Sequence, residues 1–136
     1  MRVAGRLRTK KGMKRTGWAV FMVLAYIPSL WSVAFADVPE EQKQEVEHLL
    51  EFIRTSPCVF VRNGREYQGD WAHRHVTRKY AYFRDRITST EEFIELSASE
   101  SSISGEPYWF VCDGKPRQVS QEVLLGELES YRRENE

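Results

Sequence analysis

The chain has 136 residues, of which 41% are hydrophobic, 12% aromatic and 29% charged, with 20 basic and 20 acidic side chains. This composition excludes a collagen-like, low-complexity or wholly disordered protein. The charge is unevenly distributed: residues 1–36 contain seven basic side chains and no acidic one, so the rest of the chain carries a net charge of −7. The two segments are therefore expected to have different roles.

The N-terminal segment has the pattern of an export signal. A basic stretch precedes an apolar run over residues 18–36, which ends in Ala34-Phe35-Ala36. This pattern is typical of a secretory signal peptide cleaved near Ala36. It predicts a periplasmic or secreted mature chain, residues 37–136, that forms one domain and has no stable membrane span.

Two alternatives to this signal stay open. The apolar run has 19 residues, which is just enough to span a bilayer, so an uncleaved anchor is the alternative to cleavage. Translation from Met13 instead of Met1 would give a shorter signal of 24 residues.

The mature chain contains two cysteines, Cys58 and Cys112. Disulfides form in exported proteins, so we expect a Cys58–Cys112 bond, with two buried free thiols as the alternative. Closing this loop would stabilise the fold by about 4 kcal/mol in the chain-entropy model. Two cysteines and three histidines without ligand spacing predict no metal site, and nothing in the sequence indicates a cofactor.

Hydrophobic periodicity predicts the first elements of the mature chain. Apolar residues at helical spacing, after a proline and two glutamates, predict a helix over residues 39–55. A β-branched and aromatic run over residues 58–62 predicts a strand, and Asn63-Gly64 predicts a turn after it. Asp70 is expected to cap the next helix, whose apolar face contains Ala72 and Val76.

The second half of the mature chain again contains patterns of helices and a strand. Ser89 and Glu92 have the spacing of a capping box, which predicts a short helix. A polar loop over residues 97–107 leads to a second strand, 108–112, and Ser120 is expected to cap the last helix. The fold class is therefore α+β: a small single domain with two short strands, expected to pair in one sheet, covered by about four helices.

A local reversal of charge is the first candidate for a site. Residues 62–86 contain seven basic and three acidic side chains, within an otherwise acidic mature chain. Such a patch fits an anion: a glycan carboxylate, a lipid headgroup or the acidic face of an envelope protein. The alternative is a solvated helix face with an Asp70–Arg74 pair. Nucleic acid is not expected as a partner, because of export and the negative net charge.

Single polar residues also allow a functional and a structural interpretation. His75 and Lys79 lie one helical turn apart, beside the apolar stripe. His75 is a candidate base or anion donor, or a histidine bonded to backbone. Arg62 is a candidate for binding a carboxylate, or for an internal salt bridge. In the strand 108–112, core packing is the default for the aromatic residues, and stacking on a sugar is the alternative.

The serine-rich loop suggests nucleophilic catalysis only weakly. Residues 99–105 contain four hydroxyls and a glycine, but their spacing does not match the nucleophile elbow. No acid stands in a recognisable order to orient His75. We therefore assign no catalytic residue and favour a protein that is not an enzyme.

Four short motifs stand in order along the mature chain. They are Phe60-Val61-Arg62-Asn63-Gly64, Ala72-x-x-His75-Val76-x-x-Lys79, Ile87-Thr88-x-Thr90-Glu91-x-Phe93-Ile94 and Ala98-Ser99-x-Ser101-Ser102-x-Ser104-Gly105-x-Pro107-Tyr108. Together they resemble the YfeK-like family of small exported proteins of unknown function from Gram-negative bacteria, over roughly residues 40–130. The resemblance implies a bacterial periplasmic setting and transfers no activity. Val76 stands where the family more often has leucine.

The resemblance selects the polar residues to test. Asn63 and Gly105 have ready roles as turn residues. The remaining candidates for binding a ligand or partner are Arg62, His75, Lys79, Ser99, Ser102 and Tyr108. Our leading hypothesis is a module that binds an anionic envelope ligand or a protein partner. The alternatives are a cell-wall-directed hydrolase or transferase that uses His75, and a purely structural accessory protein.

Overall fold

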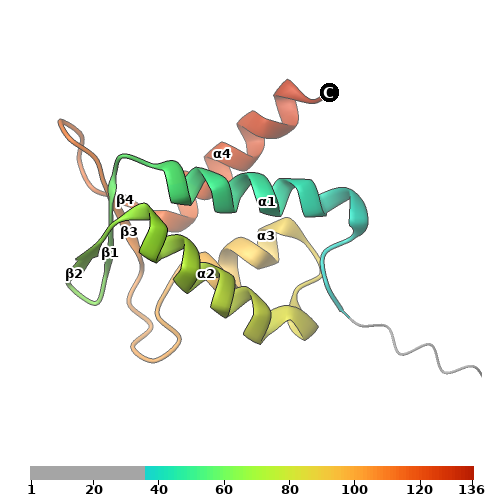
Figure 1. The fold of residues 1–136 in the computed structure, drawn as a ribbon, viewed down its shortest axis with the longest axis horizontal. Helices are drawn as coiled ribbons and strands as arrows, with labels where there is room; N and C mark the ends of the chain where they lie inside the picture. The colour runs from blue at the N-terminus through green and yellow to red at the C-terminus, as the bar shows by residue number, and fades with distance from the viewer. Residues whose placement is uncertain (1–35) are drawn as a thin grey trace, which may run out of the picture. The chain divides into compact units, whose positions relative to one another are not determined.

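The computed structural model describes residues 36–136 (Figure 1). The predicted signal peptide, residues 1–36, lies almost wholly outside this range. The described residues form an α+β domain, which confirms the predicted fold class. Its elements are α1 (Glu40–Thr55), β1 (Val59–Arg62), β2 (Arg65–Tyr67), α2 (Gly69–Phe83), the 3₁₀ turn η1 (Arg84–Arg86), α3 (Thr90–Phe93), the π-helical turn η2 (Ile94–Ala98), β3 (Trp109–Val111), β4 (Gln118–Val119) and α4 (Ser120–Glu134).

The strands form one antiparallel sheet in the order β2-β1-β3-β4. The prediction of two strands is therefore wrong in number, although the two predicted strands, β1 and β3, are indeed paired at the centre of the sheet. The missed strands β2 and β4 have only three and two residues. Segments this short cannot show the alternation of apolar and polar residues by which a strand is recognised.

The disulfide joins the two central strands. Val59 pairs with Val111, so Cys58 and Cys112, one position outward on each strand, face one another. They form the predicted disulfide, with their Cα atoms 4.4 Å apart. A disulfide here is compatible with an exported protein.

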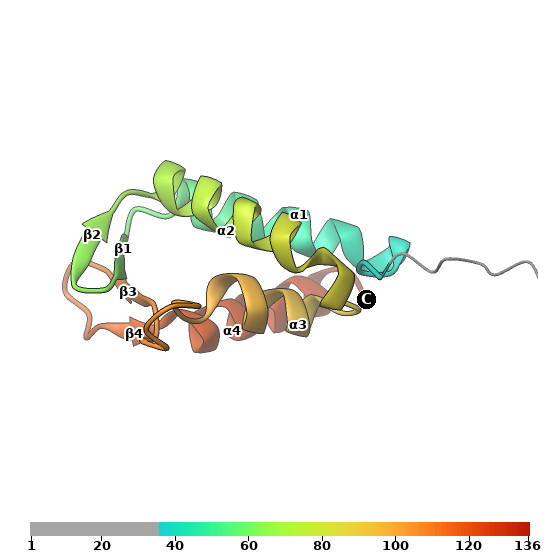
Figure 2. The same ribbon diagram turned by 90° about the horizontal axis from the view of Figure 1, so that it is seen from below.

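The helices lie in two layers, and the sheet closes one end of them (Figure 2). One layer consists of α1 and α2, and the other of α3, η2 and α4. The inner face of the sheet contributes Phe60 and Phe110, whose rings meet edge to face at 5.6 Å. The core between the layers contains the buried side chains of Val46, Leu49, Ile53, Val76, Ile87, Phe93, Ile94, Leu124 and Leu128.

The helix starts agree only partly with the predicted caps. Ser89 accepts a hydrogen bond from the backbone N–H of Glu92, as predicted. Asp70 is not a cap, because α2 begins one residue earlier, after Gln68. Gly69, the first residue of the helix, passes so close to α1 that a Cβ would collide with the carbonyl oxygen of Arg54, so only glycine fits there. Ser120 is not a cap either: its hydroxyl donates to the carbonyl of Ala98.

The helices of this domain are short. None of those formed by residues 36–136 has the length and apolar character needed to cross a bilayer.

Candidate functional site

Arg62 ends strand β1 beside a tight turn. It follows Phe60 by two positions, so its side chain lies on the inner face of the sheet. The turn is made by Asn63 and Gly64, which both have positive φ angles, 49° and 72°. The side chain of Asn63 accepts a hydrogen bond from the hydroxyl of Ser104, which ties the turn to the serine-rich loop. Nε of Arg62 is buried and has no hydrogen-bond partner among residues 36–136.

Helix α2 brings His75 and Lys79 to the same place. They lie one turn apart, beside Ala72 and Val76, which are fully buried against the core. Nε2 of His75 lies 2.9 Å from the hydroxyl oxygen of Tyr108. Nζ of Lys79 lies 3.5 Å from the same oxygen and 5.1 Å from the centre of the tyrosine ring. Arg62, His75, Lys79 and Tyr108 therefore form one group, which we call the cationic cluster.

Tyr108 is the fixed centre of this cluster. Its side chain is fully buried, and its backbone N–H donates to the carbonyl of Ser99 at 2.8 Å. An ammonium group can only donate hydrogen bonds, so the tyrosine hydroxyl accepts from Lys79 and is left to donate its proton to Nε2 of His75. His75 is then neutral, with its own proton on Nδ1.

The pKa values of the cluster residues agree with this placement of the protons. Burial, together with the nearby charges of Arg62, Lys79 and Arg78, lowers the pKa of His75 to about 4. Burial also lowers the pKa of Lys79 to about 8; the carboxylate of Glu100 opposes this shift and Arg62 adds to it. Burial raises the pKa of Tyr108, which the neighbouring Arg62 partly offsets. The cluster thus has a positive potential around a neutral histidine.

A stack of three rings fixes the orientation of His75. Trp71 lies one turn before it on α2, with the two rings nearly parallel and their centres 5.0 Å apart. Tyr67, at the end of β2, also stacks on Trp71, with the ring centres 3.5 Å apart.

The remaining predicted residues belong to the loop beside the cluster. The hydroxyl of Ser99 is turned inward and donates to the carbonyl of Ile94 at 2.7 Å, across the π-helical turn η2. Ser102 is exposed and lines the cavities next to Lys79. The structure thus brings His75, Lys79 and Tyr108 into contact, with Arg62 near enough to shift their pKa values. It places Ser102 at the rim and gives the Ser99 hydroxyl a structural role.

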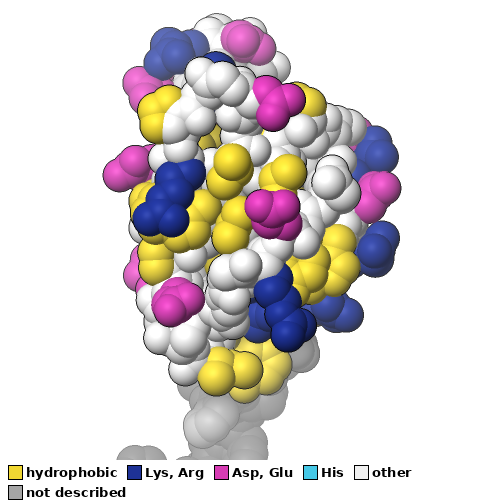
Figure 3. Space-filling model, turned by 90° about the vertical axis from the view of Figure 1, so that its left-hand side faces the viewer, with side chains coloured by type: hydrophobic (Ala, Val, Ile, Leu, Met, Phe, Trp, Pro, Cys, Tyr) yellow, Lys and Arg dark blue, Asp and Glu magenta, His cyan; other side chains and the backbone are white. Residues whose placement is uncertain are grey.

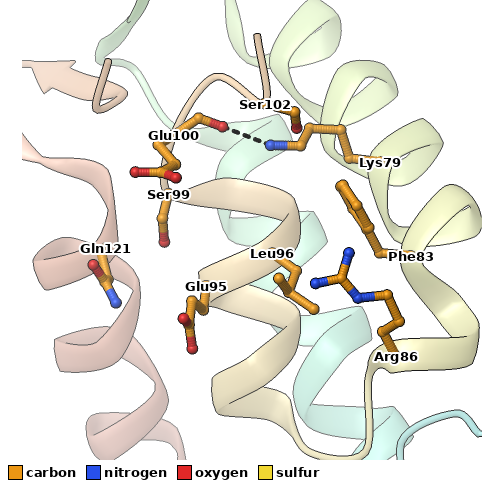
Figure 4. Close-up of a pocket in the computed structure, with 9 residues that line it drawn as sticks. All are labelled: Lys79, Phe83, Arg86, Glu95, Leu96, Ser99, Glu100, Ser102 and Gln121. Atoms are coloured by element: carbon orange, nitrogen blue, oxygen red, sulfur yellow. Dashed lines mark hydrogen bonds between the residues drawn. The ribbon is translucent and has the colours of Figure 1, made fainter. Parts of the chain in front are cut away.

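Two cavities meet at Lys79, Phe83 and Ser102. The first, of about 320 Å³, is otherwise lined by His75, Arg78 and Tyr82. The second, of about 300 Å³, is drawn in Figure 4, where Lys79 reaches from α2 toward the loop and donates to the carbonyl of Glu100 at 2.6 Å. Its other lining residues are Arg86, Glu95, Leu96, Ser99, Glu100 and Gln121. Lys79 lines both cavities.

The basic patch predicted for residues 62–86 has few internal partners. Within the described part of the chain, Arg84 is the one member that forms an ion pair, with Asp37 at 3.1 Å. Asp70 and Arg74, at helical spacing, form no such pair there. Most of the patch is therefore not neutralised by carboxylates of its own domain.

The hydrolase hypothesis expected a serine hydroxyl at hydrogen-bond distance from His75. Within residues 36–136, the hydrogen bond of the His75 ring goes to Tyr108 instead. A base that already accepts the proton of a buried tyrosine is poorly placed to activate a serine.

Sequence reasoning missed Arg78, Tyr82 and Glu100 as neighbours of the cluster. Arg78 and Tyr82 lie one and two turns after Arg74 on the exposed side of α2, so helical spacing from His75 was an available signal. The contact of Glu100 depends on the π-helical turn before it, for which the sequence carries no recognised signal.

Comparisons with known proteins agree with the predicted family. A model of a family of unknown function, DUF5329, matches residues 40–132. The uncharacterised protein YfeK of Salmonella typhimurium is 33% identical over 97 residues, which cover 71% of this chain and 77% of the relative. The search of solved structures found no match. Because the matched region contains all four motifs and the whole cationic cluster, the chain belongs to the YfeK-like family of unknown function, DUF5329.

Proposed function

We propose that this protein is a small binding module of the bacterial envelope, which binds an anionic group, phosphate or carboxylate, at the cationic cluster. The observation that carries the proposal is the presence of two cations without a carboxylate partner. Lys79 donates to a backbone carbonyl and to Tyr108, and Nε of Arg62 has no partner among residues 36–136. A bound anion would supply the missing counter-charge.

The energetics favour such a ligand. Lys79 loses hydration on burial, which is why its pKa falls to about 8. Arg62 adds a second positive charge near it. An anion in a cavity beside Lys79 would restore a favourable interaction to the ammonium group and offset the charge of Arg62 at longer range. Charge-assisted hydrogen bonds of this kind are the stronger ones in proteins.

The proposed location rests on the N-terminal pattern and on the disulfide. The first 36 residues have the order of a secretory signal, which ends near Ala36. The Cys58–Cys112 bond fits an oxidising compartment such as the periplasm. Anionic glycans and lipid headgroups are ligands that a protein would meet there.

The test is a titration followed by NMR or calorimetry. The protein is expressed as the full chain, purified, and titrated with sulfate, glycerol 3-phosphate and glucuronate. We expect saturable binding at pH 7 and at least a tenfold weaker affinity for Lys79→Met. The control is Lys115→Met, which removes an exposed lysine from the loop between β3 and β4.

The probes also separate the two sources of the anion. Tighter binding of glycerol 3-phosphate than of glucuronate assigns the site to phosphate ligands, and the reverse order assigns it to acidic sugars. The absence of saturable binding of all three probes, or an equal loss in Lys115→Met, would overturn the proposal.

A further inference from the structure

The outer face of the sheet, opposite the helices, is lined by apolar side chains. Side chains alternate along a strand, so the neighbours of the buried Phe60 and Phe110 point away from the core. The register places them in two rows across the sheet. These outer-face residues are Val59, Val61, Trp109, Val111 and Val119.

No helix of the described residues covers this face. In Figures 1 and 2 all the helices lie on the other side of the sheet. Phe60 and Phe110 on the inner face are 1% and 2% exposed, whereas Val111 is 36% exposed and the other outer-face residues are partly buried. Figure 3 shows hydrophobic side chains across the middle of the outer face, with basic and acidic ones among and around them.

An apolar outer face needs an explanation. Antiparallel sheets with one solvated face usually carry polar residues on that face. Apolar side chains that stay partly exposed on such a face can instead form an interaction surface. Trp109 strengthens this interpretation, because large aromatic side chains are enriched at interfaces.

Two opposite charges flank the patch. Glu66 is on β2 and pairs with Val61, so its side chain belongs to the outer face. Arg117 lies just before β4, with its guanidinium 4.2 Å from the centre of the Trp109 ring. Glu66 lies in the row of Val61, Trp109 and Val119, and the guanidinium of Arg117 reaches this row at the Trp109 ring from the neighbouring row. Neither forms an ion pair within residues 36–136.

We propose that the outer face binds the outer face of a second copy of this chain. In a two-fold symmetric pair, the same surface patch serves both copies. If the axis runs parallel to the strands between β1 and β3, then β2 of one copy faces β4 of the other. Glu66 of each copy then faces Arg117 of its partner. The apolar rows meet in the middle, as in aligned sheet packing.

The size of the surface predicts the strength of the pair. Four strands about 4.8 Å apart, with about three residues each, cover about 200 Å². Stable interfaces bury about 800 Å² per partner. The association is therefore expected to be weak, with rapid exchange between monomer and dimer.

The first experiment is sedimentation equilibrium of the purified full chain from 10 µM to 1 mM. We expect a rise in apparent mass from monomer toward dimer. Val111→Lys should abolish this rise. The matched control is Leu125→Lys on α4, because Leu125 has a similar exposure, 38%, outside the sheet. Circular dichroism verifies that both variants fold.

A charge exchange tests the orientation. Glu66→Arg and Arg117→Glu alone should each weaken the association severalfold, because like charges then meet across the axis. The double variant should restore it. A wild-type chain that stays monomeric at 1 mM would overturn the proposal, and so would a double variant as weak as the single ones. These variants leave the cationic cluster intact, so anion binding is measured independently of them.

Discussion

Two groups of charged side chains in the domain differ in whether they form ion pairs. Arg132 on α4 donates to both oxygens of Glu45 on α1, at 2.7 and 2.9 Å, and to Glu91 on α3 at 2.6 Å. In the cationic cluster, Lys79 and Arg62 have no carboxylate at such a distance within the described residues. Arg132 forms ion pairs with two carboxylates, whereas Lys79 and Arg62 form none within the described residues.

This difference indicates which charged side chains stabilise the fold. Hydrogen bonds from Arg132 lower the pKa values of Glu45 and Glu91, so the charged forms of both are favoured in the folded state. At Lys79 the charged form is disfavoured, because burial lowers its pKa to about 8. The first group fastens three helices together. The second keeps a partly buried lysine without an ion pair among the described residues.

Removing Arg132 should give the largest effect on stability. Arg132→Met leaves Glu45, whose side chain is only 14% exposed, without its main partner. We expect a loss of about 2 kcal/mol in the free energy of unfolding, which corresponds to a fall in Tm of about 10 °C for a domain of this size. Thermal unfolding measures the loss, and sulfate binding should be unchanged.

The matched control for this variant is Arg133→Met. Arg133 pairs with Glu129 on its own helix, and both side chains are well exposed. Its removal should cost less than about 0.5 kcal/mol. Equal losses in the two variants would contradict a special role for the buried Arg132 group.

Removing Arg62 should weaken anion binding and leave the stability of the fold nearly unchanged. Arg62→Met keeps an apolar stem for packing and removes a charge whose Nε has no hydrogen-bond partner in residues 36–136. We expect at least tenfold weaker binding of sulfate and a change in Tm of less than about 3 °C. A fall in Tm of about 8 °C with unchanged binding would instead support the structural accessory hypothesis.

The pH dependence of binding should depend on Lys79. Its charged form is the one that attracts an anion, so sulfate affinity should fall as the pH rises through about 8. Sulfate keeps its own charge over this range. We expect a severalfold loss of affinity between pH 7 and 9, measured by calorimetry. Lys79→Met should bind weakly at both pH values, and an unchanged slope in that variant would assign the effect to another group.

Sequence reasoning succeeded where the chemistry is local. Asn63-Gly64 predicted a turn because few residues adopt positive φ, and helical spacing brought His75 and Lys79 together. It failed where contacts join distant segments. Tyr108 reaches His75 across 33 positions and Arg132 reaches Glu45 across 87, and no local pattern records either distance. The residues of the cationic cluster could therefore be named from the sequence, but their contacts with one another could not be predicted.

The same limit explains the strands. β2 and β4 are too short to show the alternation of apolar and polar residues that predicts a strand; they are Arg65–Tyr67 and Gln118–Val119. They form strands because they pair with β1 and β3. With β2 and β4 missing, the outer face of the sheet and the positions of Glu66 and Arg117 could not be predicted either.

The smallest expected effect concerns His75 in acid. Its pKa is about 4 in the folded chain, because of burial and the charges of Arg62, Lys79 and Arg78, and about 6.5 when unfolded. Between these values the unfolded chain binds a proton at this residue and the folded chain does not. The free energy of unfolding should therefore decrease as the pH falls from about 6.5 to 4, and this contribution should level off below.

His75→Gln isolates that contribution. Glutamine can still accept the hydrogen bond of Tyr108 but does not titrate, so the difference between the two proteins removes the effect of carboxylates that protonate in the same range. Because the ring is only partly buried, water screens it, and we expect less than about 1 kcal/mol, measured by denaturant unfolding at pH 7, 5.5 and 4. If the two proteins lose stability equally, His75 is solvated in the folded chain, and the cluster has less positive potential than its geometry indicates.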